Sequence, residues 1–142
     1  RQGMEGGHGG PFGSVVVMEG VVVGRGCNQV TSTNDPTAHA EVVAIRNACK
    51  ALGRFDLRGA TLYASCEPCP MCLSSALWAR VGRIVYANDR FQAAKIGFDD
   101  ALIYEQVAKE PDRRIIPCEH RPNDDALSVF RDWVTKADRV PY

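Results

Sequence analysis

The pattern of hydrophobic and polar residues predicts a hairpin at the start of the chain. β-Branched residues form a run in the stretch 12–18, which opens on Phe12, and form another in 21–27. Glu19-Gly20 lies between the two stretches and is typical of a tight turn. The glycine-rich stretch before Phe12 favours a loop over a helix. Two antiparallel strands are therefore expected first.

Further along the chain, helix-favouring segments alternate with short apolar runs. Thr37 and Asn123 can each cap a helix, and Pro36 and Gly53 flank the first of these helices. Helices are predicted over 37–52, 69–80, 99–109 and 124–137, strands over 60–64 and 83–87, and an extended segment over 111–117. We expect Trp78 and Trp133 to lie in the core. This order predicts one α/β domain over residues 1–142, with a mixed sheet and helices on its faces.

Composition narrows the classes of protein that the chain can belong to. The chain has 142 residues, 45% of them hydrophobic and 24% charged, which suits one domain with its own core. Seventeen Lys and Arg balance 17 Asp and Glu, whereas dedicated nucleic-acid binders are more often basic. No apolar run approaches the roughly 18–20 residues of a membrane span. We therefore expect neither a nucleic-acid partner nor a membrane.

The cysteines indicate metal binding. Three of the six, Cys66, Cys69 and Cys72, fall within seven residues, a spacing that fits a metal site better than disulfides. A reducing, cytoplasmic location follows as an expectation. Residue 1 is Arg, so we also expect natural residues upstream of it.

Two short motifs carry the candidate chemistry. His39-Ala40-Glu41 lies near the start of one predicted helix, and Cys69 and Cys72 lie on one face at the start of another. Two thiolates and a neutral imidazole are ligands that Zn²⁺ prefers, and a helix N-terminus favours the thiolate form. Three protein ligands leave a fourth position for water, as in catalytic zinc sites.

Glu41 is the candidate proton carrier, because zinc can lower the pKa of a coordinated water to about 7 and a nearby carboxylate can move its proton. Each motif alone is weak: a lone C-x-x-C can be redox-active or structural, with Cys66 as a fourth ligand. H-x-E followed about 30 residues later by P-C-x-x-C is the signature of zinc deaminases. The pair therefore predicts a catalytic zinc site.

The sequence resembles the cytidine-deaminase-like superfamily over nearly its whole length, and within it the small bacterial guanine deaminases. The matching segments are Gly10–Gly13, Asn34–Glu41, Ser65–Leu73, Trp78–Arg80, Gly97–Asp100 with Ile103-Tyr104, and Tyr142. The resemblance implies a three-layer α/β/α fold with a central five-stranded mixed sheet. It also implies a first helix before Gly9, which we expect this chain to lack.

The resemblance also implies roles for single residues. His39, Cys69 and Cys72 match the ligands of one Zn²⁺ per active site, and Glu41 matches the proton shuttle. The expected contacts to the substrate come from Phe12, Asn28, the backbone N–H of Ala40, and Tyr142. Asp100 matches an acidic residue at the purine amino group, with Asp99 as the alternative.

Several of these positions have structural alternatives. Asp99 and Asp100 could simply begin a helix, since acids favour that end. Phe12 and Asn28 could serve packing and loop capping, and Glu67 is interpreted as structural, holding backbone N–H groups.

The expected reaction is hydrolysis of guanine, a free nucleobase, to xanthine and ammonia. The resemblance implies a homodimer in which the segment after about residue 100 is swapped, so that Tyr142 could serve a neighbour's site. Guanosine, cytosine, cytidine or an aminotriazine remain alternative substrates. A tRNA adenosine deaminase and a non-catalytic zinc-stabilised binding module are the alternative classes.

Overall fold

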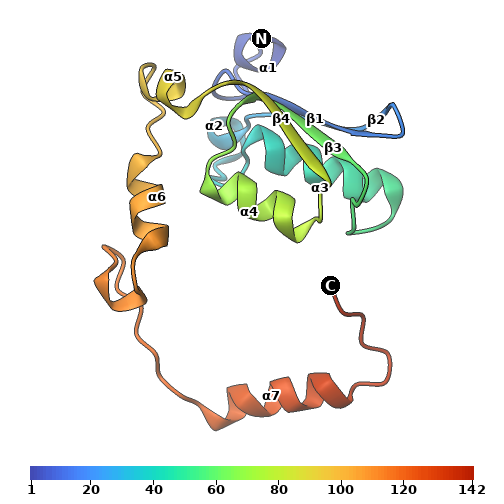
Figure 1. The fold of residues 1–142 in the computed structure, drawn as a ribbon, viewed down its shortest axis with the longest axis vertical. Coiled ribbons are helices and arrows are strands. Elements are labelled where there is room, and N and C mark those ends of the chain that lie inside the picture. The colour runs from blue at the N-terminus through green and yellow to red at the C-terminus, as the bar shows by residue number, and fades with distance from the viewer. The chain divides into compact units, whose positions relative to one another are not determined.

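The structure is a computed structural model that describes residues 1–142, and Figure 1 shows its elements. The chain divides into two units, residues 1–104 and 105–142. In chain order the elements are α1 (Gln2–Glu5), β1 (Gly13–Met18), β2 (Val21–Cys27), α2 (Val30–Thr33), α3 (Ala40–Leu52), β3 (Thr61–Cys66), α4 (Pro70–Trp78), β4 (Arg83–Asn88), α5 (Arg90–Ala94), α6 (Ala101–Ala108), the 3-10 helix η1 (Pro111–Arg113) and α7 (Asp124–Thr135). None of these helices has the length and apolar content that a bilayer crossing requires.

The sheet of the first unit has four strands in the order β2-β1-β3-β4. β1 pairs antiparallel with both β2 and β3, and β3 pairs parallel with β4. The predicted hairpin, the mixed character of the sheet and the α/β class are therefore confirmed. A bulge between Val16 and Val17 interrupts the register of β1 with β2.

The prediction of five strands was wrong. Directly after β4, Asp89 and Gln92 form a reciprocal capping box that turns the chain into α5. The stretch expected to be extended begins with η1 instead, and Pro111 and Pro117 lack the N–H groups that a strand ladder needs. The prediction that no helix precedes Gly9 was also wrong, because α1 lies there.

The core lies between the sheet and the helices α3 and α4, which pack against each other (Figure 1). It is built from one face of the strands, through Val16 and Leu62, and from small residues of the two helices. The full buried cluster comprises Val16, Ala44, Ile45, Ala48, Leu57, Ala60, Leu62, Ala76 and Ala79. Val15, Val17 and Tyr63 point to the opposite face, and each keeps partial or full exposure. Within the first unit, therefore, the long helices cover one face of the sheet, and the three-layer arrangement is not complete.

The second unit ends in an amphipathic helix. The side-chain oxygen of Asn123 accepts a hydrogen bond from the N–H of Ala126, which confirms the predicted cap of α7. Leu127, Phe130 and Trp133 recur at helical spacing and are exposed by 46%, 72% and 43%. Trp78 on α4 is 68% exposed, so the expectation that both tryptophans are core residues was wrong for this chain.

Two glycines in β2 allow α3 to approach the sheet closely. A Cβ added to Gly26 would lie 2.1 Å from the carbonyl oxygen of Ala40, and one added to Gly24 would lie 2.4 Å from that of Ala44. Both obstacles are helix backbone, so a side chain at either position would push α3 away from the sheet. The position of the first turn of α3 therefore depends on Gly26.

We expect Gly26→Ala to destabilise the protein by about 1–3 kcal/mol, because overpacking displaces backbone. Chemical denaturation would measure the loss. Gly82→Ala is the matched control, since its new Cβ would lie at ordinary contact distance, 3.4 Å from its nearest neighbours. Equal midpoints for the Gly26 variant and the unsubstituted protein would contradict the close-approach argument.

Candidate active site

The N-termini of α3 and α4 present the predicted metal ligands. His39 is the N-cap residue of α3 and Cys69 that of α4, both in extended conformation, with ψ of 154° and 168°. Thr37 is not the cap that the sequence suggested. The side-chain oxygen Oδ1 of Asp35 accepts hydrogen bonds from the N–H and the hydroxyl of Thr37, and this local turn delays the helix to Ala40. The delay places His39 at the junction of loop and helix.

The three ligand atoms have the spacing of a tetrahedral zinc site. His39 Nδ1 lies 3.6 Å from Cys69 Sγ and 3.4 Å from Cys72 Sγ, and the two sulfurs lie 3.6 Å apart. Zinc–sulfur bonds near 2.3 Å and zinc–nitrogen bonds near 2.0 Å imply tetrahedral ligand separations of about 3.5–3.8 Å. The residues therefore fit the ion, and the structure brings together the ligands predicted from sequence.

Proton sharing couples the three ligands. Hydrogen bonds with Cys72 and then His39 lower the pKa of Cys69 to about 4, whereas the same contact with Cys69 and burial raise the pKa of Cys72. The pKa of His39 is raised by its hydrogen bond with Cys69. A metal needs both thiolates and a neutral imidazole, so metal loading releases protons and the affinity falls as the pH falls.

Glu41 lies beside this cluster. It is only 7% exposed, and its carboxylate oxygen Oε2 accepts a hydrogen bond from Cys72 Sγ at 3.4 Å. Burial raises the pKa of Glu41 above its ordinary value. A buried carboxyl group with a raised pKa takes up a proton more readily than an ordinary glutamate, which suits a proton carrier.

A cavity of about 390 Å³ opens beside the ligands, within the size range of small-molecule sites. It is lined by Gly10, Phe12, Asn28, Val30, Thr31, Pro36, His39, Ala40, Glu41, Cys66, Glu67, Cys69, Arg90, Ala93, Phe98, Asp99, Asp100 and Ile103. Phe12 and Phe98 meet edge to face, with ring centroids 4.8 Å apart. All lining residues belong to the first unit.

Asn28 has one end of its side chain occupied by structure. Its oxygen Oδ1 accepts hydrogen bonds from the N–H groups of Gly10 and Val30, both at 3.2 Å. Those contacts fix the orientation of the amide and leave the donor Nδ2 for a ligand in the cavity. The loop-capping and ligand-contact interpretations of Asn28 are therefore compatible.

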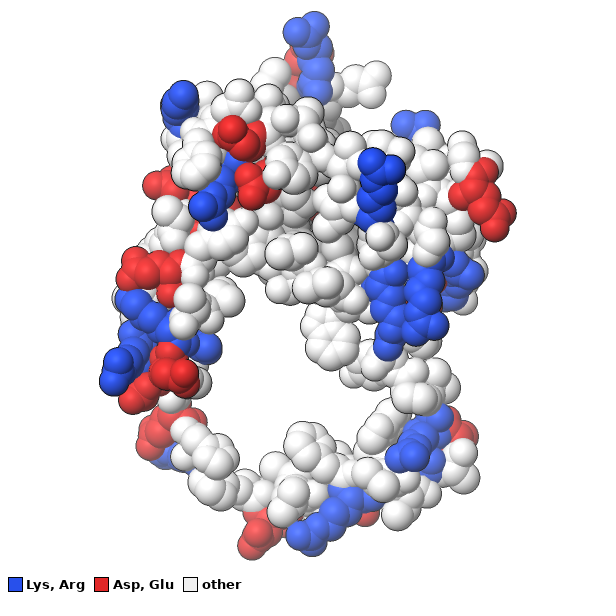
Figure 2. All heavy atoms as spheres, viewed as in Figure 1, with Lys and Arg blue, Asp and Glu red and all other residues white.

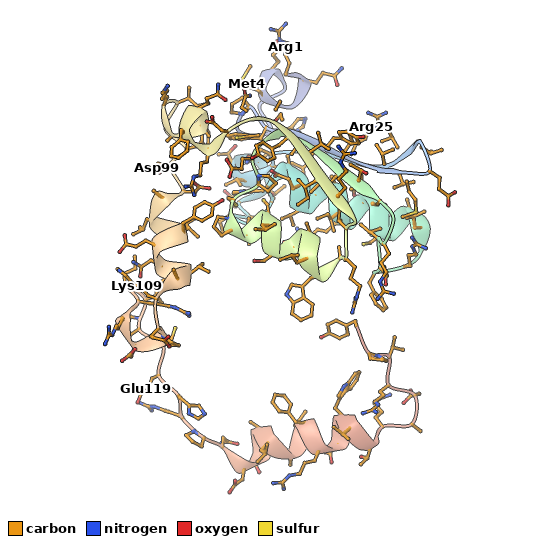
Figure 3. The ribbon with its side chains drawn as sticks, in the orientation of Figure 1. Arg1, Met4, Arg25, Asp99, Lys109 and Glu119 are labelled. Atoms are coloured by element: carbon orange, nitrogen blue, oxygen red, sulfur yellow. The ribbon has the colours of Figure 1, made fainter.

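The two aspartates differ in their partners. Asp99, labelled in Figure 3 between α5 and α6, accepts a hydrogen bond from the N–H of Ala101 at 2.9 Å. Asp100 forms no such cap, and burial followed by the nearby Cys69 thiolate raises its pKa. Asp99 thus caps the start of α6, whereas the pKa of Asp100 depends on the charge of the metal ligand Cys69.

Glu67 has the structural contact expected of it, because its Oε2 accepts a hydrogen bond from the backbone N–H of Arg90 at 3.1 Å. Sequence reasoning missed Arg90. The signal that could have found the helix it begins is the capping box formed by Asp89 and Gln92. Tyr142 belongs to the second unit and is 70% exposed.

Comparison with known proteins agrees with this geometry. Residues 3–88 match the family described as the cytidine and deoxycytidylate deaminase zinc-binding region. Since this match spans more than half of the chain, the protein belongs to that family of zinc-dependent deaminases.

One relative is similar over the whole length. Guanine deaminase of Bacillus subtilis (strain 168) is 47% identical over 99% of this chain and 90% of its own length. The X-ray structure of guanine deaminase from that organism superposes with a TM-score of 0.96 over the same shares of the two chains. Within the deaminase family, the chain therefore belongs to the guanine deaminase branch.

Other relatives match a smaller part. The tRNA-specific adenosine deaminase of Agrobacterium fabrum is 47% identical over 54% of this chain and 50% of its own. A solved protein in complex with 2,6-diaminopurine is 31% identical, with a TM-score of 0.66 over 70% of this chain and 56% of its own.

Replacing a ligand should remove the metal. We expect Cys72→Ser to lose most of its bound zinc, because a thiolate is exchanged for a weaker hydroxyl ligand. Cys66→Ser is the matched control: Cys66 is also buried and close in sequence, but its Sγ lies against the carbonyl of Asp89. The zinc content of the two variants would be measured by atomic emission and compared with that of the unsubstituted protein. Equal zinc loss in both variants would instead indicate a structural site in which Cys66 is the fourth ligand beside His39, Cys69 and Cys72.

Proposed function

We propose that this protein hydrolyses guanine to xanthine and ammonia. The observation that carries the proposal is that the three metal-ligand atoms and the buried carboxyl group of Glu41 lie together beside a cavity large enough for a purine ring. Full-length similarity to a guanine deaminase supports this substrate over adenosine in tRNA, where the match covers about half of the chain. One solved relative is also in complex with 2,6-diaminopurine in one structure and, as a point mutant, with 8-azaguanine in another.

His39, Cys69 and Cys72 would hold the zinc ion, one in each site. When bound, zinc supplies Lewis acidity, which lowers the pKa of water to about 7 and polarises the reacting carbon. Thiolate ligands of this kind persist in a reducing compartment, so we propose a cytoplasmic location.

Glu41 would carry the proton. A water oxygen forms a bond to the purine carbon that bears the amino group, and Glu41 takes one proton from that water. The carbon–nitrogen bond then breaks, and Glu41, together with Asp100, delivers the proton to the leaving nitrogen. The amino group plus this proton leaves as ammonia, and the remaining hydroxyl tautomerises to the carbonyl of xanthine.

The remaining cavity residues would orient the ring. Asn28 Nδ2 and the backbone N–H of Ala40, which is free at the start of α3, are donors suited to the ring's acceptors. Phe12 offers an aromatic contact from one wall, and Asp100 an acceptor for the amino group. Their location along a single cavity supports these roles.

Net charge offers little support for a polynucleotide substrate. Acidic and basic side chains occur together over the face shown in Figure 2. The cavity itself contains Glu41, Glu67, Asp99 and Asp100 against the single cation Arg90. Phosphate backbones bind to lysine and arginine, so a carboxylate-rich cavity favours a neutral base.

Turnover should be specific and should depend on Glu41. We expect the zinc-loaded protein to release ammonia from guanine, and Glu41→Gln to lose this activity by at least about 100-fold, the range of general acid–base catalysis. Ammonia release from guanine, guanosine, adenine, cytosine, cytidine and an aminotriazine would be compared. If another compound in this panel were turned over instead of guanine, that compound would be the substrate of the cavity. Release from none of them, with zinc bound and the fold intact, would favour a polynucleotide substrate or a non-catalytic zinc module.

The same assay tests the choice of aspartate. Asp100→Asn should lower kcat/KM for guanine, whereas Asp99→Asn, the matched neighbour, should have little effect, because asparagine keeps the oxygen that caps α6. The reverse order of effects would exchange the two roles.

We further propose a homodimer with an exchanged second unit. The apolar stripe of α7 and the open sheet face around Val15 and Tyr63 are complementary in character, and each lacks cover within its own unit. A second copy's α7 could provide the missing third layer, and its Tyr142 could then close the neighbour's cavity.

Subunit complementation would test the exchange. Glu41→Gln protein and Tyr142→Ala protein should each be impaired, and refolding the two together should restore activity. In an exchanged heterodimer, one site receives both an intact Glu41 and an intact Tyr142 from different copies. Without exchange no site has both, so the mixture would show only the average of the two variants. Light scattering would establish the oligomeric state in parallel.

A further inference from the structure

Arg90 is the only lysine or arginine among the residues that line the cavity. It begins α5, and none of the ion pairs in the structure involves it. Its guanidinium carbon lies 4.4 Å from the ring centroid of Tyr104 and 4.9 Å from that of Phe91. Two cation–π contacts at these distances give a flexible side chain a defined place.

The backbone of Arg90 also contacts the segment just before the metal ligand Cys69. The Arg90 N–H donates to Glu67 Oε2 at 3.1 Å, and the Glu67 N–H donates to the Asn88 carbonyl at 2.8 Å. Glu67 is two residues before the ligand Cys69. Arg90 is thereby connected to the segment that carries the first thiolate.

Its side chain also connects to the helix that carries Asp100. Tyr104, under the guanidinium, donates its backbone N–H to the Asp100 carbonyl at 3.2 Å. The Tyr104 hydroxyl donates to the Pro68 carbonyl at 3.5 Å, again next to Cys69. These contacts lead from Glu67, just before Cys69, to Arg90, from Arg90 to Tyr104, and from Tyr104 back to Pro68. Asp100 lies one helical turn before Tyr104.

We propose that Arg90 is a positioning residue that holds the carboxylate of Asp100 in register with the metal ligands. Arg90 touches neither the reacting atoms nor the metal ligands in this scheme, and it acts through Tyr104 and Asp100. The inference rests on the proposed role of Asp100 and goes beyond it, because it identifies what fixes that carboxylate.

The positive charge of Arg90 affects Asp100 as well, in addition to the stacking of its guanidinium on Tyr104. Burial, the Cys69 thiolate and Glu67 raise the pKa of Asp100, whereas a backbone hydrogen bond and then the charge of Arg90 lower it. Tyr104, on the same helix as Asp100, has a raised pKa and remains a neutral phenol near pH 7. Loss of Arg90 should thus both loosen Asp100 and raise its pKa, which reduces the carboxylate form that accepts a hydrogen bond from the amino group of the substrate.

Arg90→Met should lower kcat/KM for guanine by about 10- to 100-fold, the cost of misplacing a catalytic group by about 1 Å. Zinc stoichiometry and the unfolding midpoint should stay close to those of the unsubstituted protein. Arg90→Lys, which keeps a cation over the rings, should recover most of the loss. Arg83→Met, at an exposed arginine outside the cavity, is the matched control and should have no effect.

The pH profile separates positioning from simple structural support. Because removal of the cation raises the pKa of Asp100, the acidic limb of kcat/KM should move to higher pH in Arg90→Met. In an Asp100→Asn background, Arg90→Met should cost much less than it does alone, since both changes act on one unit. An unmoved acidic limb together with no rescue by lysine would overturn the proposal.

The two proposals fail in different ways. Full activity of Asp100→Asn would remove Asp100 from the reaction and with it the proposed function's second acid. An impaired Asp100→Asn, combined with an equal Arg90→Met loss in both backgrounds, would leave the proposed function intact and reject only the role of Arg90.

Discussion

The close approach of α3 to strand β2 is the constraint on which the site depends. His39 and Glu41 are carried by the first turn of α3, and that turn lies against Gly26 with no space for a Cβ. The opposing ligands belong to α4, which packs on α3 through small residues such as Ala76. Zinc tolerates ligand distances within about 0.2 Å, so a helix displaced by one side chain would lose the site.

The same geometry determines the electrostatics. Two helix N-termini converge on one point, and their partial positive charges favour thiolate and carboxylate there. Burial acts in the opposite direction, and for Glu41 burial is the larger effect, since its pKa is raised. Cys69, which sits at the N-cap itself and shares protons with two neighbours, has a lowered pKa. One pair of helix ends thus provides both an ionised ligand and a carboxyl group that can hold a proton.

Sequence reasoning succeeded where short-range chemistry determines structure. The hairpin follows from β-branched runs around Glu19-Gly20, and the ligand set follows from motif spacing. It failed where hydrogen bonds of polar side chains decide where a helix begins. The start of α3 is fixed by a turn at Asp35, and the short helix α5 depends on a cap and on Glu67, neither of which an apolar pattern reveals. The pattern also marked Trp133 as apolar and therefore buried, whereas its side chain on α7 is 43% exposed.

The distribution of cavity residues along the sequence explains how one chemistry can serve different substrates. The metal ligands and Glu41 all fall within residues 3–88, the part shared with the zinc-dependent deaminase family. Arg90, Phe98 and Asp100 line the same cavity from beyond that boundary. A change in the later segment can therefore alter what the cavity accepts without disturbing the metal. Such a division works only if the two segments keep a fixed relative position. The contacts of Arg90 with Glu67 and of Tyr104 with Pro68 cross the boundary between them.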